Sequence, residues 1–225
     1  IIDCCKFKSH SYTVASGAVK NMFGVIPGLV KAQMHARFPQ RESFCRFLCQ
    51  FCAHVKPQLC VMDAVEGMQG NGPSSGDRYD GQRLLAALDP FALDYGALTL
   101  LGIDPDQTPI HREAVKLGLV DPEAIELIAP EEAWESLIRH DFRLPETMKG
   151  LIQLIPSPLA ALRRHFAPYP KPDAARCLGC GECVRDCPVQ AITLADHKAV
   201  VDRRRCIRCY CCQEVCPAHV VQLKR

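Results

Sequence analysis

Residues 177–188 read Cys177-Leu178-Gly179-Cys180-Gly181-Glu182-Cys183-Val184-Arg185-Asp186-Cys187-Pro188. Residues 206–217 repeat the pattern as Cys206-Ile207-Arg208-Cys209-Tyr210-Cys211-Cys212-Gln213-Glu214-Val215-Cys216-Pro217. We refer to them as the first copy and the second copy. Both follow C-x2-C-x2-C-x3-C-P, and the second begins 29 residues after the first. Eight cysteines in two matched quartets, each followed by proline, predict two sets of metal ligands.

The spacing within each copy is typical of bacterial-type ligand runs for [4Fe–4S] clusters. In such runs three close cysteines bind one cluster, and the fourth cysteine binds the cluster of the other copy. We therefore predict two [4Fe–4S] clusters, each bound by one set of cysteines. The first cysteine set is Cys177, Cys180, Cys183 and Cys216, and the second cysteine set is Cys206, Cys209, Cys212 and Cys187.

Two other uses of paired cysteines are less consistent with this pattern. A zinc ribbon also has C-x2-C pairs, but it needs neither a third cysteine after two residues nor a Cys-Pro after three. Disulfide frameworks belong to small secreted domains, and the sequence shows no secretory signal. Cys211 lies outside the pattern and is predicted to be a spare thiol near the second set.

The segment between the copies predicts a β-hairpin, with strands at 191–194 and 199–202 joined by a polar turn. Residues 220–223 repeat the first of these strands after the second copy. Together with the cysteine pattern, these features resemble the bacterial two-cluster ferredoxin module, over roughly residues 170–225. The resemblance implies a small α+β domain with internal pseudo-twofold symmetry.

Composition places the chain among ordinary soluble proteins, except for its cysteines. It has 225 residues, 48% of them hydrophobic and 23% charged, and 15 are cysteine. Free thiols and clusters both suffer oxidation, so we expect a reducing, cytoplasmic location. No apolar run is long enough to span a membrane, for which about 18 residues are needed.

The charge is unevenly divided along the chain. Residues 171–225 carry ten Lys or Arg and six Asp or Glu, a balance of +4, whereas residues 1–170 balance at −2. Each oxidised cluster with its four thiolates contributes about −2, so the loaded module would be near neutral. The basic run Arg203-Arg204-Arg205 either offsets the clusters or is a solvated turn. The net charge of +2 does not favour nucleic acid as a partner.

The chain begins with Ile1-Ile2-Asp3-Cys4-Cys5, a pattern typical of the middle of a buried strand. We therefore expect part of this domain to precede residue 1. A polar loop is predicted at 6–11, and a second polar stretch follows at 16–25. Their side chains Lys8, His10, Lys20 and Asn21 suit an anionic or phosphorylated ligand, and the alternative is a solvated loop.

Residues 42–55 predict an amphipathic helix, because apolar residues recur at three- and four-residue intervals. The helix also carries three cysteines. Without a loop pattern we interpret them as small buried hydrophobes, together with three further cysteines near the N-terminus. These six core cysteines are Cys4, Cys5, Cys45, Cys49, Cys52 and Cys60.

A short strand is predicted at 58–65, followed by a loop at 66–76 with four glycines. The loop fits neither a P-loop nor a dinucleotide fingerprint. However, open α/β sheets place ligands where an acidic strand end meets a Gly-rich loop. Asp63, Glu66 and the later Asp94 are therefore candidate acid–base or metal-binding carboxylates, and the alternative is a Gly-rich surface turn.

Helices are predicted from Pro90, capped by Asp89, and at 110–117, and a strand is predicted at 124–128. This alternation favours an α/β domain with a mostly parallel sheet. Residues 130–170 are rich in proline. We expect an α/β domain at 1–129, a helical connector at 130–170 and a ferredoxin-type domain at 171–225, with a hinge or boundary at 167–172.

Residues 1–128 resemble the family of domain of unknown function 362, whose members are often fused to ferredoxin modules. The stretches that carry the resemblance are Lys6-Phe7-Lys8-Ser9-His10, Ser16-Gly17-Ala18-Val19-Lys20-Asn21-Met22-Phe23-Gly24, Met62-Asp63-Ala64-Val65-Glu66-Gly67-Met68-Gln69-Gly70-Asn71-Gly72-Pro73 and Asp89-Pro90-Phe91-Ala92-Leu93-Asp94. Family members usually have a further α/β portion before the first of these stretches. The resemblance names no substrate.

These observations lead to one main hypothesis and two alternatives. The main hypothesis is an iron–sulfur protein, an oxidoreductase or a subunit of one, whose two clusters pass electrons to or from the α/β domain or a partner protein. A redox partner protein and a small anionic ligand are the expected partners. The alternatives are a non-enzymatic carrier or interaction subunit, and clusters with a purely structural role.

Overall fold

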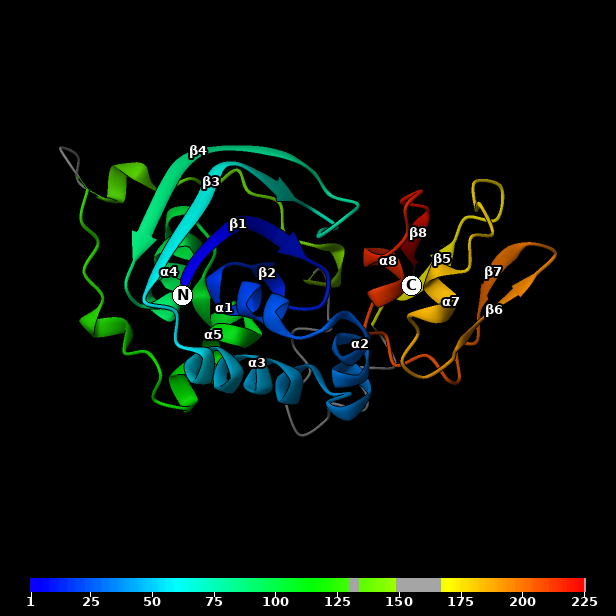
Figure 1. Cartoon of the computed structure of the whole chain (residues 1–225). Coiled ribbons are helices and arrows are strands. Elements are labelled where there is room, and N and C mark those ends of the chain that lie inside the picture. The colour runs from blue at the N-terminus through cyan, green and yellow to red at the C-terminus, as the bar shows by residue number, and fades with distance from the viewer. Residues whose placement is uncertain (130–133, 149–166, 225) are drawn as a thin grey trace.

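The computed structural model describes residues 1–129, 134–148 and 167–224. Figure 1 shows an N-terminal part, which contains strands β1–β4, and a C-terminal module, which contains strands β5–β8. No helix in these residues is both long and apolar enough to cross a membrane.

The N-terminal part contains a four-stranded sheet with the strand order β2-β1-β3-β4. Its strands are β1 (Ile2–His10), β2 (Val14–Ser16), β3 (Leu59–Gln69) and β4 (Asp77–Ala87). Only β1 and β3 pair in parallel, and both outer strands pair antiparallel to their neighbours. The sheet is therefore mixed, and the expected mostly parallel sheet is not confirmed.

Connection length explains the mixed sheet. Residues 11–13 join β1 to β2, and residues 70–76, which we call the Gly-rich loop, join β3 to β4. Connections this short bring the chain back antiparallel, whereas a parallel return needs a long crossover. Between β1 and β3 the chain has room for such a crossover, with helices α1 (Ala18–Asn21), α2 (Gly28–Arg37) and α3 (Arg41–Val55).

Helices cover one face of this sheet (Figure 1). The helices that mainly contact its strands are α1 and α4 (Pro90–Leu100), whereas α3 and α5 (Pro109–Lys116) pack mainly on other helices. The side chain of Asp89 caps α4 by accepting from the N–H groups of Phe91 and Ala92, as the sequence predicts. The shorter 3₁₀ turns are η1 (Met22–Val25), η2 (Pro105–Gln107), η3 (Pro122–Ala124), η4 (Trp134–Leu137) and η5 (Glu146–Met148).

Two apolar cores hold the N-terminal part together. One lies between the sheet and α4, and it includes Phe7, Met62 and Leu98. The other surrounds α3 and includes Phe44, with Tyr210 of the C-terminal module in the same core. The module is therefore packed on the N-terminal part through shared apolar contacts.

Six cysteines of the N-terminal part were predicted to be buried in the core, and the structure confirms this for all but one. Cys5, Cys45, Cys49, Cys52 and Cys60 are buried. Cys4 is exposed, so its predicted burial is wrong. It lies in β1, where successive side chains point to opposite faces, and its neighbours Asp3 and Cys5 occupy the buried face.

Three other sequence expectations for the N-terminal part are wrong. The predicted polar loop at 6–11 is mostly strand, because β1 continues to His10. The predicted loop from Glu66 begins only at residue 70, because Glu66–Gln69 still pair with β4, a strand that was not predicted. The predicted strand at 124–128 is instead the end of η3 followed by irregular backbone.

The C-terminal module has two small antiparallel sheets and two short helices. Its elements are β5 (Tyr169–Pro172), α7 (Glu182–Arg185), β6 (Ile192–Ala195), β7 (Lys198–Val201), α8 (Cys211–Glu214) and β8 (Val221–Lys224). Strands β6 and β7 form the predicted hairpin, and β5 pairs with β8.

The predicted connector at 130–170 is only partly visible. Residues 130–133 and 149–166 lie outside the described residues. The described part contains η4 and η5, and its last residues, Tyr169 and Pro170, begin β5. Prolines are tolerated there because a two-stranded sheet leaves one edge of each strand unpaired.

Candidate iron–sulfur centre

A pocket in the C-terminal module is lined by all four members of the first cysteine set. Cys177, Cys180 and Cys183 come from the first copy, and Cys216 comes from the end of the second copy. The pocket has about 390 Å³ of empty space, including space open to solvent. Sequence positions far apart are therefore brought to one place by the fold.

A second pocket is lined by all four members of the second cysteine set. Here Cys206, Cys209 and Cys212 come from the second copy, and Cys187 comes from the end of the first copy. Its empty space is about 310 Å³, again including space open to solvent. Cys211 also lines this pocket. Each pocket thus combines three predicted ligand cysteines of one copy with the last cysteine of the other.

The chemistry of the pockets fits an iron–sulfur cluster. Backbone N–H groups donate to sulfur, from Ala191 to Cys187 at 3.1 Å and from Arg208 to Cys206 at 3.4 Å. Backbone N–H groups of Ala199 and Gly179 lower the pKa of Cys177, which favours the thiolate that binds iron. Burial raises the pKa of Cys206, so forming its thiolate costs free energy. Bound iron would offset this cost, because it replaces the thiol proton.

The cysteines line the walls of two pockets. In the described part of the chain, no three His, Cys, Asp or Glu side chains converge closely enough to hold a metal ion. Such an arrangement suits a multinuclear cluster better than the closed tetrahedron of a structural zinc ion.

The two copies share an unusual backbone conformation. In the first copy Gly179 and Gly181 have positive φ angles of 66° and 79°. In the second copy the equivalent residues are Arg208 and Tyr210, with φ angles of 57° and 65°. A bulky side chain at positive φ is strained, so the second copy must have compensating contacts.

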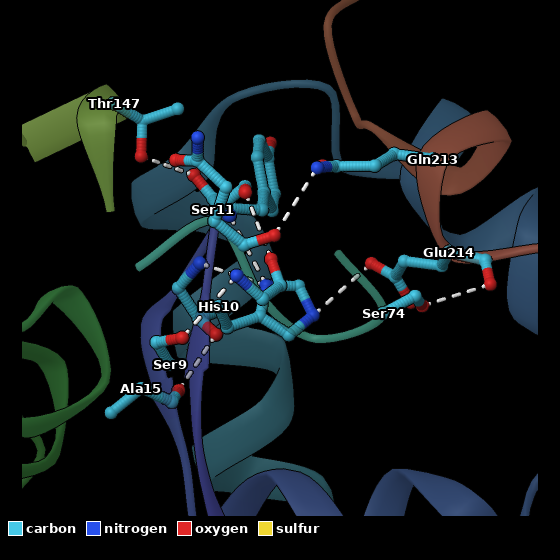
Figure 2. Close-up of polar contacts among 12 residues, drawn as sticks. Ser9, His10, Ser11, Ala15, Ser74, Thr147, Gln213 and Glu214 are labelled. Carbon is cyan, nitrogen blue, oxygen red and sulfur yellow. Dashed lines mark hydrogen bonds and ion pairs between the residues drawn. The ribbon is translucent and has the colours of Figure 1, made fainter. Parts of the chain in front are cut away.

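Those contacts join the second copy to the N-terminal part, at the end of β1 and at the Gly-rich loop (Figure 2). Glu214 Oε1 lies 3.1 Å from His10 Nε2, and the Glu214 carbonyl accepts from Ser74 Oγ at 3.0 Å. Gln213 Nε2 donates to the carbonyl of Asn71 at 3.3 Å. Helix α8 is therefore attached directly beside the Gly-rich loop.

His10 is held in one tautomer by its neighbours. Its Nδ1 accepts from the backbone N–H groups of Tyr12 at 3.1 Å and Thr13 at 3.4 Å. The proton of the neutral ring is therefore on Nε2, facing the Glu214 carboxylate. Burial and then the charge of Lys20 lower the pKa of His10. Burial alone would raise the pKa of Glu214, but His10, Lys20 and His35 lower it to about 2.

The structure brings together only some of the candidate residues of the N-terminal part. The charge of Lys20 acts on both His10 and Glu214, so these three groups lie near one another. Lys8 lies half-buried two residues before His10 in β1. Asn21 is turned to a different partner, and its Nδ2 donates to Asp3 Oδ1 at 2.6 Å.

The candidate carboxylates are placed apart from one another. Asp63 pairs with Lys6 at 2.6 Å, and this bond lowers the pKa of Asp63. Glu66 pairs with Arg78 at 3.0 Å, and both side chains are more than half exposed.

Asp94 accepts from the backbone N–H groups of Ala18 and Val19, at 2.6 and 3.1 Å, where α1 begins. It lines a pocket of about 400 Å³, including space open to solvent, which α1, α4, α5 and the strands β1 and β2 surround. The structure therefore does not gather Asp63, Glu66 and Asp94 into a single site.

Sequence reasoning missed the residues that join the two parts, namely Tyr210, Gln213 and Glu214. A signal for them was present. At the equivalent positions the first copy has Gly181, Val184 and Arg185, so the copies differ at each position where the second one meets the N-terminal part. Comparing the two copies position by position would have pointed to this surface.

Family comparisons agree with this division of the chain. Residues 1–99 match the family model described as domain of unknown function (DUF362). Residues 169–217 match the model described as 4Fe-4S dicluster domain. The chain thus combines a DUF362 domain with an iron–sulfur module of the ferredoxin type, and the predicted combination is confirmed.

A curated relative covers much of the chain. The thylakoid-associated protein sll1697 of Synechocystis sp. is 32% identical over 167 residues, which is 74% of this chain. The match covers 52% of the relative, so the chain spans about half the length of that protein. No solved structure matches the chain.

Proposed function

We propose that the protein holds two [4Fe–4S] clusters and transfers electrons to or from its N-terminal part or a partner redox enzyme. The observation that carries this proposal is the pair of pockets, each lined by one complete cysteine set. Such a cluster, when bound, accepts and donates electrons one at a time.

The residues of the chain have three roles in this proposal. The eight cysteine thiolates would bind the iron. The backbone N–H groups that point at sulfur, such as those of Ala191 and Arg208, would stabilise negative charge. The module also has an excess of basic residues, which would offset the charge of the two clusters with their thiolates.

The N-terminal part is proposed to receive or supply the electrons. Its Gly-rich loop contacts α8 through Ser74 and Asn71, so it lies beside the second copy. Lys8, His10, Lys20 and Asn21 remain the proposed contacts of a small anionic ligand. Asp63, Glu66 and Asp94 remain proposed acid–base or metal-binding groups, although they do not share one site.

We also propose a cytoplasmic location and a separate redox partner protein. Fifteen cysteines favour a reducing compartment. The relative is described as thylakoid-associated. By analogy, the partner of this chain would be a protein at a membrane surface.

Cysteine substitutions test the ligand assignment. Cys180→Ser and Cys209→Ser should each lower the iron content of anaerobically purified protein from about eight to about four per chain. Because the sets interleave, Cys216→Ser should remove the same EPR signal as Cys180→Ser. Cys211→Ser is the matched control and should keep both clusters. If Cys216→Ser instead removes the signal that Cys209→Ser removes, the proposed assignment is wrong.

One observation favours a structural role for the second set. Cys206, Cys209 and Cys212 are 9%, 9% and 7% exposed, and Tyr210 between them belongs to the apolar core around α3. A purely structural cluster would be loaded but would not be reduced and reoxidised reversibly. An EPR-monitored redox titration therefore separates this alternative from electron transfer.

A further inference from the structure

The two cysteine sets differ in their surroundings although their backbones match. Positive φ angles occur at the same two positions of each copy, as glycines in the first and as Arg208 and Tyr210 in the second. A non-glycine residue in this conformation is strained, because its Cβ approaches the backbone too closely. Two such residues in one ligand loop need stabilisation from elsewhere in the chain.

Tyr210 obtains that stabilisation from the N-terminal part and the segment that precedes β5. It is 2% exposed, and its hydroxyl donates to the carbonyl of Pro168 at 2.7 Å. Its ring meets Tyr12 edge to face with centroids 6.3 Å apart. Because Tyr210 lies between Cys209 and Cys212, fixing its side chain fixes the backbone that presents both thiols.

Gln213 and Glu214 add polar contacts on the same side. The Glu214 side chain faces His10, which is 1% exposed and is itself held by two backbone N–H groups (Figure 2). Gln213 is 1% exposed and donates to Asn71. Helix α8 is thus attached to the N-terminal part at both of these residues.

The first copy has the opposite character. Leu178 is 70% exposed, Cys180 is exposed, and the side chain of Arg185 is 64% exposed. In the described residues, the ion pairs of Arg185 are with Glu182 and Asp186 of its own copy. This loop therefore faces solvent, whereas the equivalent loop of the second copy faces the N-terminal part.

We propose that the second cysteine set is the domain-facing centre and that Tyr210, supported by the contact of Glu214 with His10, is the positioning residue that fixes its geometry. The first cysteine set is then the solvent-facing centre, which the N-terminal part does not control. This inference rests on the proposed function, because it assumes that both sets bind clusters.

Tyr210→Gly is a sharp test, because it gives the second loop the same residue as the first. The change relieves the backbone strain and removes the contacts to Tyr12 and Pro168. We expect it to shift the reduction potential of one centre and to leave the other unchanged in an anaerobic EPR-monitored titration of the full chain. Repeating the titration in the Cys180→Ser background, which keeps only the second set, identifies the centre that moves.

Two further variants separate positioning from stability. Tyr210→Phe keeps the ring contact and should restore most of the wild-type potential. Tyr79→Ala removes another buried tyrosine, which bonds Asp141 at 2.8 Å in the N-terminal part. It should lower the melting temperature and move neither potential.

The outcomes are distinct. A shift of the second-set potential, or loss of that cluster alone, supports the inference. Unchanged potentials, or equal shifts of both centres, overturn it even where the melting temperature falls. Wild-type protein without labile sulfide would instead refute the proposed function itself.

Discussion

At the scale of single residues, Asp94 shows how burial changes the chemistry of a carboxyl group. Burial raises its pKa to about 7, and the N–H groups of Ala18 and Val19 only partly counteract this effect. The sequence analysis named Asp94 as a candidate carboxylate in the helix that begins at Pro90. It did not show that the carboxyl group joins α4 to the start of α1, because that contact spans 76 residues.

Asp94 should make stability depend on pH. Its pKa in the folded protein is above the ordinary value of 3.8, so the folded state binds more protons than the unfolded state between these two values. The contribution of Asp94 to stability should therefore fall as pH rises from about 4 to about 7, by at most about 1.4 kcal/mol per unit. Asp94→Asn should flatten this slope.

Melting temperatures of cluster-loaded wild type and Asp94→Asn, measured anaerobically across this range, give the comparison. Parallel curves for the two proteins would show that Asp94 does not titrate there.

At the scale of elements, α3 and α5 are joined by a buried carboxylate. The side chain of Glu113 in α5 is 2% exposed, and it accepts from Arg46 Nε of α3 at 2.8 Å and from Lys116 at 2.7 Å. Burial would raise the pKa of Glu113, but Lys116 and Arg46 lower it. The carboxylate is therefore charged at neutral pH and well satisfied.

Glu113→Ala should destabilise the protein by about 1–3 kcal/mol, because it removes two charge-assisted hydrogen bonds and leaves a gap between the helices. A fall in melting temperature of about 2–4 °C per kcal/mol is expected. Arg78→Ala breaks the exposed Glu66–Arg78 pair and is the control, with an expected change below about 0.5 kcal/mol. Equal effects of both substitutions would contradict the role given to burial.

The sequence predicted a helix or strand correctly where the residues that determine it lie close together in the chain. The stripe of α3 and the Asp89-Pro90 cap of α4 lie within a few residues, and both helices are found where expected. Strand β4 was missed because Asp77–Gln82 is mostly polar and its pairing with β3 is a tertiary contact.

At the scale of the whole molecule, the cysteine sets occupy different depths. Cys180 is exposed in the first set, whereas Cys206, Cys209 and Cys212 are buried in the second. We expect limited air oxidation to remove iron from the first set before the second, because exposed thiolates are oxidised first. EPR of partly oxidised samples, with Cys209→Ser as the reference for the first set, gives the order. Loss of iron from the second set first would contradict the assignment of the second set as the domain-facing centre and the first set as the solvent-facing centre.

The site could be predicted from sequence only where the motif is contiguous. The eight cysteines are spaced closely enough that their grouping into two sets followed from the spacing alone. The surface formed by His10, Ser74, Tyr210 and Glu214 could not be derived in this way, because it joins residues up to 204 positions apart.

The most direct test of the central claim is the iron and acid-labile sulfide content of the anaerobically purified chain, followed by EPR after dithionite reduction. Two [4Fe–4S] clusters predict about eight iron and eight sulfide per chain, with the signal of two interacting centres. Zinc without labile sulfide would contradict the account and make the C-terminal module a structural metal domain.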